Sequence, residues 1–208
     1  MPTQGSAPAT QVPLLDLQAQ HASIRDAVMP AVLAVIERQQ FIMGPEVAQL
    51  EAAIARLSRV GHAIACASGT DALLLPLMAL GLKPGDEVIT PAFTFFATAG
   101  TVHNTGGTPV FVDIERGSFN LSPDAVEAAI TPRTRAIIAV HLYGQMAALE
   151  KILAVAAKHG LPVSRTRRSP SEHAATWTVR GGWPARPAGW EPSRFSRPRT
   201  WGPGETAA

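Results

Sequence analysis

The sequence has few of the features that mark secreted or membrane proteins. Its single cysteine, Cys66, excludes an internal disulfide and fits a reducing compartment. No apolar run approaches the roughly 20 residues that a membrane-spanning helix needs. Residues 1–10 lack the charged start and apolar centre of a secretory signal. We therefore expect a cytoplasmic protein that does not bind a membrane.

Negative charge is scarce in the last part of the chain. Residues 164–208 hold eight arginines, three glutamates and no aspartate, which gives a net charge of +5. The whole chain carries only +2, so residues 1–163 carry −3. A basic tail can bind nucleic acid. The other features of this tail favour a different explanation, and we expect no nucleic-acid partner.

Residues 1–163 alternate between helical and strand patterns. Apolar residues at helical spacing are followed by short apolar runs that Gly, Pro and Asp punctuate. This alternation predicts an α/β fold with a mainly parallel sheet. The predicted helices are 26–40, 45–58, 70–80, 95–104, 123–130 and 147–158, and the predicted strands are 63–67, 87–90, 109–113 and 135–140.

The composition changes abruptly after Val163. Residues 164–208 contain all four tryptophans and six prolines but no Leu, Ile, Met or Lys, and neither periodicity persists. Read one base out of register, residues 164–174 can encode IEDAAQSIGA, and residues 194–208 can encode FLPSKNLGAWGDGG. We therefore predict two segments: a folded body, 1–163, and an out-of-frame tail, 164–208, which is disordered and forms no regular sheet strand. A natural Arg/Pro-rich linker is the alternative, but linkers rarely concentrate tryptophan.

Two sites in the body carry polar or small residues after a predicted strand. In Ser68-Gly69-Thr70-Asp71, small residues open a helix whose first N–H groups and dipole favour an anion such as a phosphate. A plain N-cap is the alternative and the commoner one on local sequence alone. His141 follows the strand 135–140, where it could contact a ligand or donate to a carbonyl as a structural histidine. We assign it no catalytic role.

The body resembles the DegT–DnrJ–StrS family of pyridoxal-phosphate (PLP) dependent sugar aminotransferases. The resemblance runs from about residue 12 to 163 through VPLLDL, FIMGPEVAQLE, ASGTDAL, GDEVITPAFTFFATA, GTPVFVDIE and AVHLYGQ. It implies the N-terminal part of the large domain of an aspartate-aminotransferase-like fold. It also implies PLP as cofactor, a nucleotide-linked keto-sugar and an amino-acid donor such as glutamate as partners, and a homodimer.

The resemblance also assigns roles to individual residues. It makes Ser68, Gly69, Thr70 and Asp71 the phosphate-binding segment and Phe95, after the threonine of TPAFTFFATA, the ring that stacks on the cofactor. For Phe95 a core position is the open alternative. Phe93 and Phe96 are predicted to belong to the core.

Two catalytic groups of the family are missing from the printed frame. The aspartate that pairs with the pyridine nitrogen and the Schiff-base lysine occur only in the shifted strings IEDAAQ and SKNLG. Of the three lysines present, Lys83 lies in a predicted turn, and Lys151 and Lys158 lie on exposed helix faces. None has the desolvated setting that such a lysine needs. We therefore expect no catalytic residue and no turnover.

Three other interpretations remain possible. A non-catalytic fragment or pseudogene product fits the missing groups. A sugar dehydratase of the same family carries histidine in place of the lysine, but the shifted string shows KN, which favours transamination. A dinucleotide-binding domain is disfavoured because no G-x-G-x-x-G follows a strand.

Overall fold

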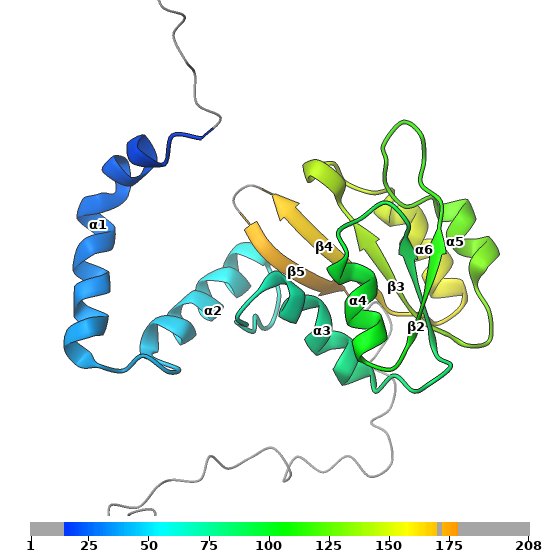
Figure 1. Cartoon of the computed structure of the whole chain (residues 1–208), viewed down its shortest axis with the longest axis horizontal. Helices are drawn as coiled ribbons and strands as arrows, with labels where there is room; N and C mark the ends of the chain where they lie inside the picture. The colour runs from blue at the N-terminus through cyan, green and yellow to red at the C-terminus, as the bar shows by residue number, and fades with distance from the viewer. Residues whose placement is uncertain (1–14, 170–171, 179–208) are drawn as a thin grey trace, which may run out of the picture. The chain divides into compact units, whose positions relative to one another are not determined.

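A computed structural model describes residues 15–169 and 172–178 (Figure 1). The chain divides into two compact units, with the boundary between Ala65 and Cys66. The first unit holds two helices, α1 (Leu17–Arg38) and α2 (Pro45–Ser58), neither of which has a buried residue. Helix α1 begins nine residues before its predicted start, because Asp16 caps it by accepting a hydrogen bond from Ala19 N at 2.9 Å. Within the described ranges, no helix is long and apolar enough to cross a membrane.

The second unit is built on a five-stranded sheet in the order β2-β1-β3-β4-β5. Its first four strands are parallel, and β5 runs antiparallel to β4 at the edge. The predicted α/β fold with a mainly parallel sheet is therefore confirmed. The strands are β1 (Glu87–Pro91), β2 (Thr108–Val112), β3 (Thr134–Val140), β4 (Val163–Ser169) and β5 (Glu172–Thr178).

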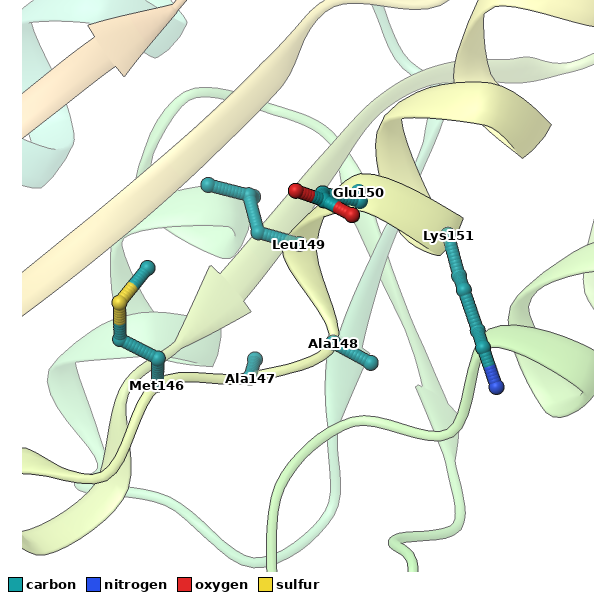
Figure 2. Close-up of a pocket in the computed structure, with 6 residues that line it drawn as sticks. All are labelled: Met146, Ala147, Ala148, Leu149, Glu150 and Lys151. Atoms are coloured by element: carbon teal, nitrogen blue, oxygen red, sulfur yellow. The ribbon is translucent and has the colours of Figure 1, made fainter.

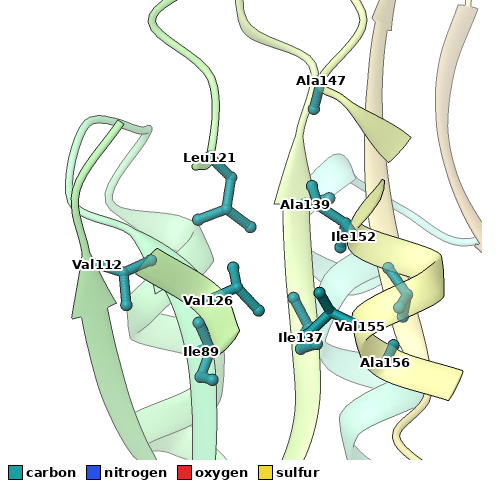
Figure 3. Close-up of a cluster of buried hydrophobic side chains, with 11 residues drawn as sticks. Ile89, Val112, Leu121, Val126, Ile137, Ala139, Ala147, Ile152, Val155 and Ala156 are labelled. Carbon is teal, nitrogen blue, oxygen red and sulfur yellow. The ribbon is translucent and has the colours of Figure 1, made fainter. Parts of the chain in front are cut away.

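Two pairs of helices cover the two faces of this sheet. One face packs against α5 (Pro123–Ala129) and α6 (Leu149–Lys158), and Figure 3 shows the resulting apolar cluster. The other face packs against α3 (Gly69–Leu80) and α4 (Ala97–Asn104). Alternation along β3 explains the two cores, because Ile137 and Ala139 point to one face and Ala136 and Ile138 to the other. This double covering is typical of parallel sheets.

The predicted strand 63–67 is wrong. These residues form no strand, and the side chain of Ile64 is 81% exposed. Backbone groups in a strand need a neighbouring strand to bond. Among the described strands, none pairs with this segment, and Ala65 N donates instead to Glu51 Oε1 at 2.9 Å.

The prediction that no sheet strand follows residue 163 is also wrong. Strand β4 continues from Val163 to Ser169, and β5 pairs with it over its whole length. The cause is the free edge of β3, whose backbone groups accept a parallel neighbour from Val163 to Thr166 whatever side chains it carries. The remainder of the predicted tail, residues 179–208, lies outside the described residues.

Candidate functional site

The carboxyl ends of the parallel strands place three loops at one edge of the sheet. Strands β1, β2 and β3 end at Pro91, Val112 and Val140. Their register puts Pro91 opposite Val112, and Ala92 N continues the pairing by donating to the carbonyl of Val112 at 3.0 Å. This edge is where ligands collect in open α/β sheets.

The predicted phosphate segment opens helix α3. Ser68 is the N-cap, in extended conformation, and its Oγ accepts a hydrogen bond from Asp71 N at 3.1 Å. The same hydroxyl lies 3.0 Å from Asp71 Oδ2 and donates to it. Ser68 and Asp71 therefore satisfy each other, and the N-cap interpretation holds for this pair.

The next two amides at this helix end are available for a ligand. The backbone N–H groups of Gly69 and Thr70 have no acceptor among the described residues, as expected for the first turn of a helix. A Cβ placed on Gly69 would meet no atom within 4 Å, so the side-chain position of this residue is open. Thr70 is exposed and its hydroxyl can add a third donor. Of the four predicted residues, Gly69 and Thr70 thus fit a phosphate best.

Phe95 lies in the loop between β1 and α4, at the carboxyl edge. Its side chain is 73% exposed, so the alternative that it belongs to the core is wrong. The loop is fixed nearby by a 3.1 Å hydrogen bond between the hydroxyls of Thr94 and Thr98. The prediction that Phe93 and Phe96 are core residues is also wrong, because they are 48% and 82% exposed. The burial on this segment falls instead on α4, from Ala97 onward.

Both predicted parts of the site belong to the second unit. Helices α3 and α4 pack on the same face of the sheet and lie next to each other in Figure 1. The end of α3, Leu80, is joined by a short turn to Glu87, the start of β1. The start of α3, which holds Gly69 and Thr70, therefore lies at the end of the helix that is farther from the start of β1.

A buried asparagine that sequence reasoning missed connects two of the edge loops. Asn120 is 1% exposed, and its Oδ1 accepts from Leu142 N at 2.9 Å while its Nδ2 donates to the carbonyl of Gln145 at 3.1 Å. The residue lies 22 and 25 positions before these partners, so no local pattern announces the contact. Asn120 holds the loop after β3 to the loop after β2.

His141 takes part in the same loop. It is 4% exposed, and its Nδ1 accepts a hydrogen bond from Ala147 N at 3.0 Å. Because Nδ1 accepts, the ring proton of the neutral imidazole is on Nε2. The hydrogen bond from Ala147 N holds His141 to the segment just before α6, and donation of the Nε2 proton to a carbonyl stays a prediction.

The lysines have the settings that their sequence positions predict. All three are exposed, and Lys158 pairs with Glu127 at 2.8 Å on the surface. Lys151 lines a hollow of about 300 Å³ at the start of α6. Figure 2 shows its side chain extending away from Met146 and Leu149, which line the same hollow. None of the predicted site residues lines this hollow.

Fold and sequence together define the class of protein. The solved structure of DesV from Streptomyces venezuelae in complex with a ketimine intermediate matches with a TM-score of 0.72 and 41% identity over 74% of this chain. NtdA from Bacillus subtilis with bound cofactor PMP matches with a TM-score of 0.71 and 36% identity over 78% of the chain. The described body has the fold of part of the large domain of PLP-type aminotransferases.

The family follows from residues 22–166, which match the model of the DegT/DnrJ/EryC1/StrS aminotransferase family. The chain belongs to this family. It is 52% identical over 152 residues to a pleiotropic regulatory protein of Geobacillus stearothermophilus. It is 50% identical over 154 residues to UDP-N-acetyl-3-dehydro-alpha-D-glucosamine 3-aminotransferase of Acidithiobacillus ferrooxidans. These matches cover 73% and 74% of the chain but only 41% and 42% of the two relatives, so the chain spans about two fifths of their length.

Proposed function

We propose that this chain is the N-terminal part of a PLP-dependent aminotransferase that acts on a nucleotide-linked keto-sugar. We also propose that the chain with the printed sequence binds the cofactor but does not convert substrate. The observation that carries the proposal is that the amides of Gly69 and Thr70 have no acceptor within the described part of the chain, which belongs to this family. Relatives named for UDP-, dTDP- and GDP-linked sugars support a nucleotide sugar as substrate. We also propose an amino-acid donor and a cytoplasmic location, and a homodimer as the assembly of the family.

The described residues would hold the cofactor at two points. The amides of Gly69 and Thr70, together with the positive end of the α3 dipole, would bind its phosphate. The exposed face of Phe95 would stack on its ring and restrict its orientation. When bound, pyridoxal phosphate supplies an electron-accepting ring, and the protein contributes binding, orientation and electrostatics.

The described residues include neither a suitable Schiff-base lysine nor an aspartate at the position that would pair with the pyridine nitrogen. The three exposed lysines have no buried setting that would favour an uncharged amine. Thr166, the β4 residue opposite the last residue of β3, Val140, carries no charge. This position lies at the carboxyl edge, where the shifted frame places the aspartate of IEDAAQ. The proposed lack of turnover rests on both points.

Strand β4 supports the proposal that residues 164–208 are read out of frame. Ser164 is fully buried in register with Ile138, and its Oγ has no hydrogen-bond partner among the described residues. The buried Nε of Arg165 likewise has none. Unpaired buried polar groups are rare in natural proteins, although the hydroxyl of Thr90 in the in-frame strand β1 also has no partner among the described residues. The shifted string places isoleucine at 164, which suits the site, and the family match ends at residue 166.

A dehydratase remains the second candidate. The chain is 29% identical to the solved GDP-4-keto-6-deoxymannose-3-dehydratase with a trapped PLP-glutamate geminal diamine, which matches with a TM-score of 0.62. The body thus resembles enzymes of both reactions, and the residue at the lysine position separates them. Resequencing the gene across the codons for residues 161–166, and then reading the restored frame, decides between lysine and histidine.

The phosphate site can be tested by removing one amide without disturbing the helix. Gly69 is the first residue of α3, a position that proline tolerates well, and Ser68 before it is extended, as a residue before proline should be. Gly69→Pro should therefore keep the fold and weaken PLP binding, followed by the ³¹P resonance of the cofactor. Gly61→Pro, in an exposed segment of the other unit, is the control. Equal PLP affinity in Gly69→Pro and wild type would contradict the phosphate assignment.

The absence of a reactive lysine has its own test. The protein mixed with PLP and treated with borohydride should carry no reduced cofactor on Lys83, Lys151 or Lys158, as read by peptide mass spectrometry. A stoichiometric adduct on any of them, together with transaminase turnover, would contradict the proposed loss of catalysis.

A further inference from the structure

Two bulky aromatic residues have a left-handed backbone on either side of the Asn120 contact. Phe119 has φ 56°, and Tyr143 has φ 51° and ψ 27°. This region favours glycine and asparagine, and bulky side chains rarely occupy it. Such conformations persist only where the surrounding structure imposes them, and they cluster at ligand-binding sites.

Hydrogen bonds around Asn120 connect the two turns in which these residues lie. Phe119 N donates to the carbonyl of Glu115 at 2.8 Å, which closes the turn just before the asparagine. The Asn120 side chain then bonds Leu142 and Gln145, the residues that flank Tyr143 and Gly144. One buried side chain therefore fixes the two loops that carry the two strained aromatic residues.

The aromatic side chains of these loops at the carboxyl edge are exposed. Phe119 is 52% exposed and Tyr143 is 79% exposed. The ring of Phe119 also packs against Phe93 from the loop after β1, with centroids 6.2 Å apart and planes tilted by 50°. We call Phe93, Phe119 and Tyr143 the aromatic rim. All three of its loops follow strands of the parallel sheet.

We propose that the aromatic rim binds the nucleobase of the nucleotide-linked sugar, with Asn120 as its positioning residue. This inference rests on the proposed function for the presence of a nucleotide. A base has a planar π-face, which stacks on aromatic side chains without requiring a particular hydrogen-bond pattern. Rigid presentation of rings reduces the entropy that binding costs. The backbone strain at the aromatic rim has this physical role.

Tyr143 gives a direct measurement because it is the only tyrosine in the sequence. Protein labelled with 3-fluorotyrosine has one ¹⁹F resonance, which reports on the aromatic rim alone. UMP should shift this resonance saturably, and N-acetylglucosamine 1-phosphate at the same concentrations should not. A shift with the sugar phosphate but not with UMP, or no saturable shift with UMP, would overturn the proposal.

Variants test whether the contact is the one proposed. Phe119→Leu removes the ring, and Phe119→Asn removes it while placing a residue that tolerates the left-handed conformation, so that the fold is retained. Both should weaken UMP binding roughly two- to tenfold, the range expected for one aromatic contact. Phe111→Leu is the matched control, since Phe111 is 55% exposed but lies within β2. Equal UMP affinity in the Phe119 variants and the control would overturn the proposal.

Two further measurements test the positioning role of Asn120 and the proposed function independently of each other. Asn120→Asp keeps the acceptor for Leu142 N but loses the donor to Gln145, so it should restore part of the UMP affinity that Asn120→Ala loses. No difference between these two variants would leave Asn120 without a positioning role and overturn that part. PLP binding, measured on the same samples, tests the proposed function separately. If the protein binds PLP but not UMP, the nucleobase proposal is wrong and the proposed function is unaffected.

Discussion

Replacing the buried serine of β4 should stabilise the protein, which is an unusual outcome for a core substitution. Ser164 is 0% exposed and its hydroxyl has no partner among the described residues. A buried unpaired polar group costs about 1–3 kcal/mol. Ser164→Ala removes that cost and leaves only a small cavity, so the free energy of unfolding should rise by about 1 kcal/mol.

A serine-to-alanine substitution at a helix cap should change the free energy of unfolding in the opposite direction. Ser122 caps α5 by accepting from Ala125 N, so Ser122→Ala should lower the free energy of unfolding by about 1 kcal/mol. Urea unfolding followed by far-ultraviolet circular dichroism measures both variants. If Ser164→Ala destabilises the protein as much as Ser122→Ala does, the hydroxyl is satisfied in solution. β4 would then be a strand that suits its printed sequence, against the out-of-frame proposal.

The remaining predictions concern Asn120 and Glu87. Asn120→Ala should lower the free energy of unfolding by about 2–4 kcal/mol, because it breaks two hydrogen bonds of a buried side chain. Asn104 is exposed, so Asn104→Ala should change the free energy of unfolding little. Comparable losses in the two variants would contradict the role of Asn120. The Thr131 hydroxyl, followed by the Arg133 guanidinium, lowers the pKa of buried Glu87 below its ordinary 4.5. The carboxylate therefore stabilises the fold above that value, and the contribution is lost as pH falls through the lowered pKa. Glu87→Gln should cost about 1–3 kcal/mol at pH 7 in urea unfolding and progressively less as the pH falls from 4.5 through the lowered pKa of Glu87, and a pH-independent difference would refute this linkage.

Several elements could be predicted from local sequence. Helix α2 matches its prediction, and β1, β2 and β3 match theirs to within one residue at each end. These elements carry strong apolar periodicity and clear flanking signals, such as Pro45 at the start of α2. Their type and order were enough to predict a mainly parallel sheet.

Other features depended on residues far apart in the chain. The segment around Ile64 has a strand-like pattern but no described partner strand, whereas residues 164–169 lack such a pattern and form β4 at the free edge of β3. Phe93, Phe95 and Phe96 occur in one apolar motif, but the loop exposes all three. Strand pairing and burial are properties of neighbours in space, which local patterns do not specify.

The sequence by itself determined the α/β class, the cap at Ser68, the family resemblance and the scarcity of lysine. Each depends on residues close together in the chain or on composition. Only the tertiary structure showed that Gly69 and Thr70 keep open amides while Ser68 and Asp71 bond each other. It also brought Asn120 to Leu142 and Gln145, and so positioned the aromatic rim. Hydrogen bonds across more than 20 residues form only when the sheet sets the loops beside each other, because their geometry depends on the whole fold.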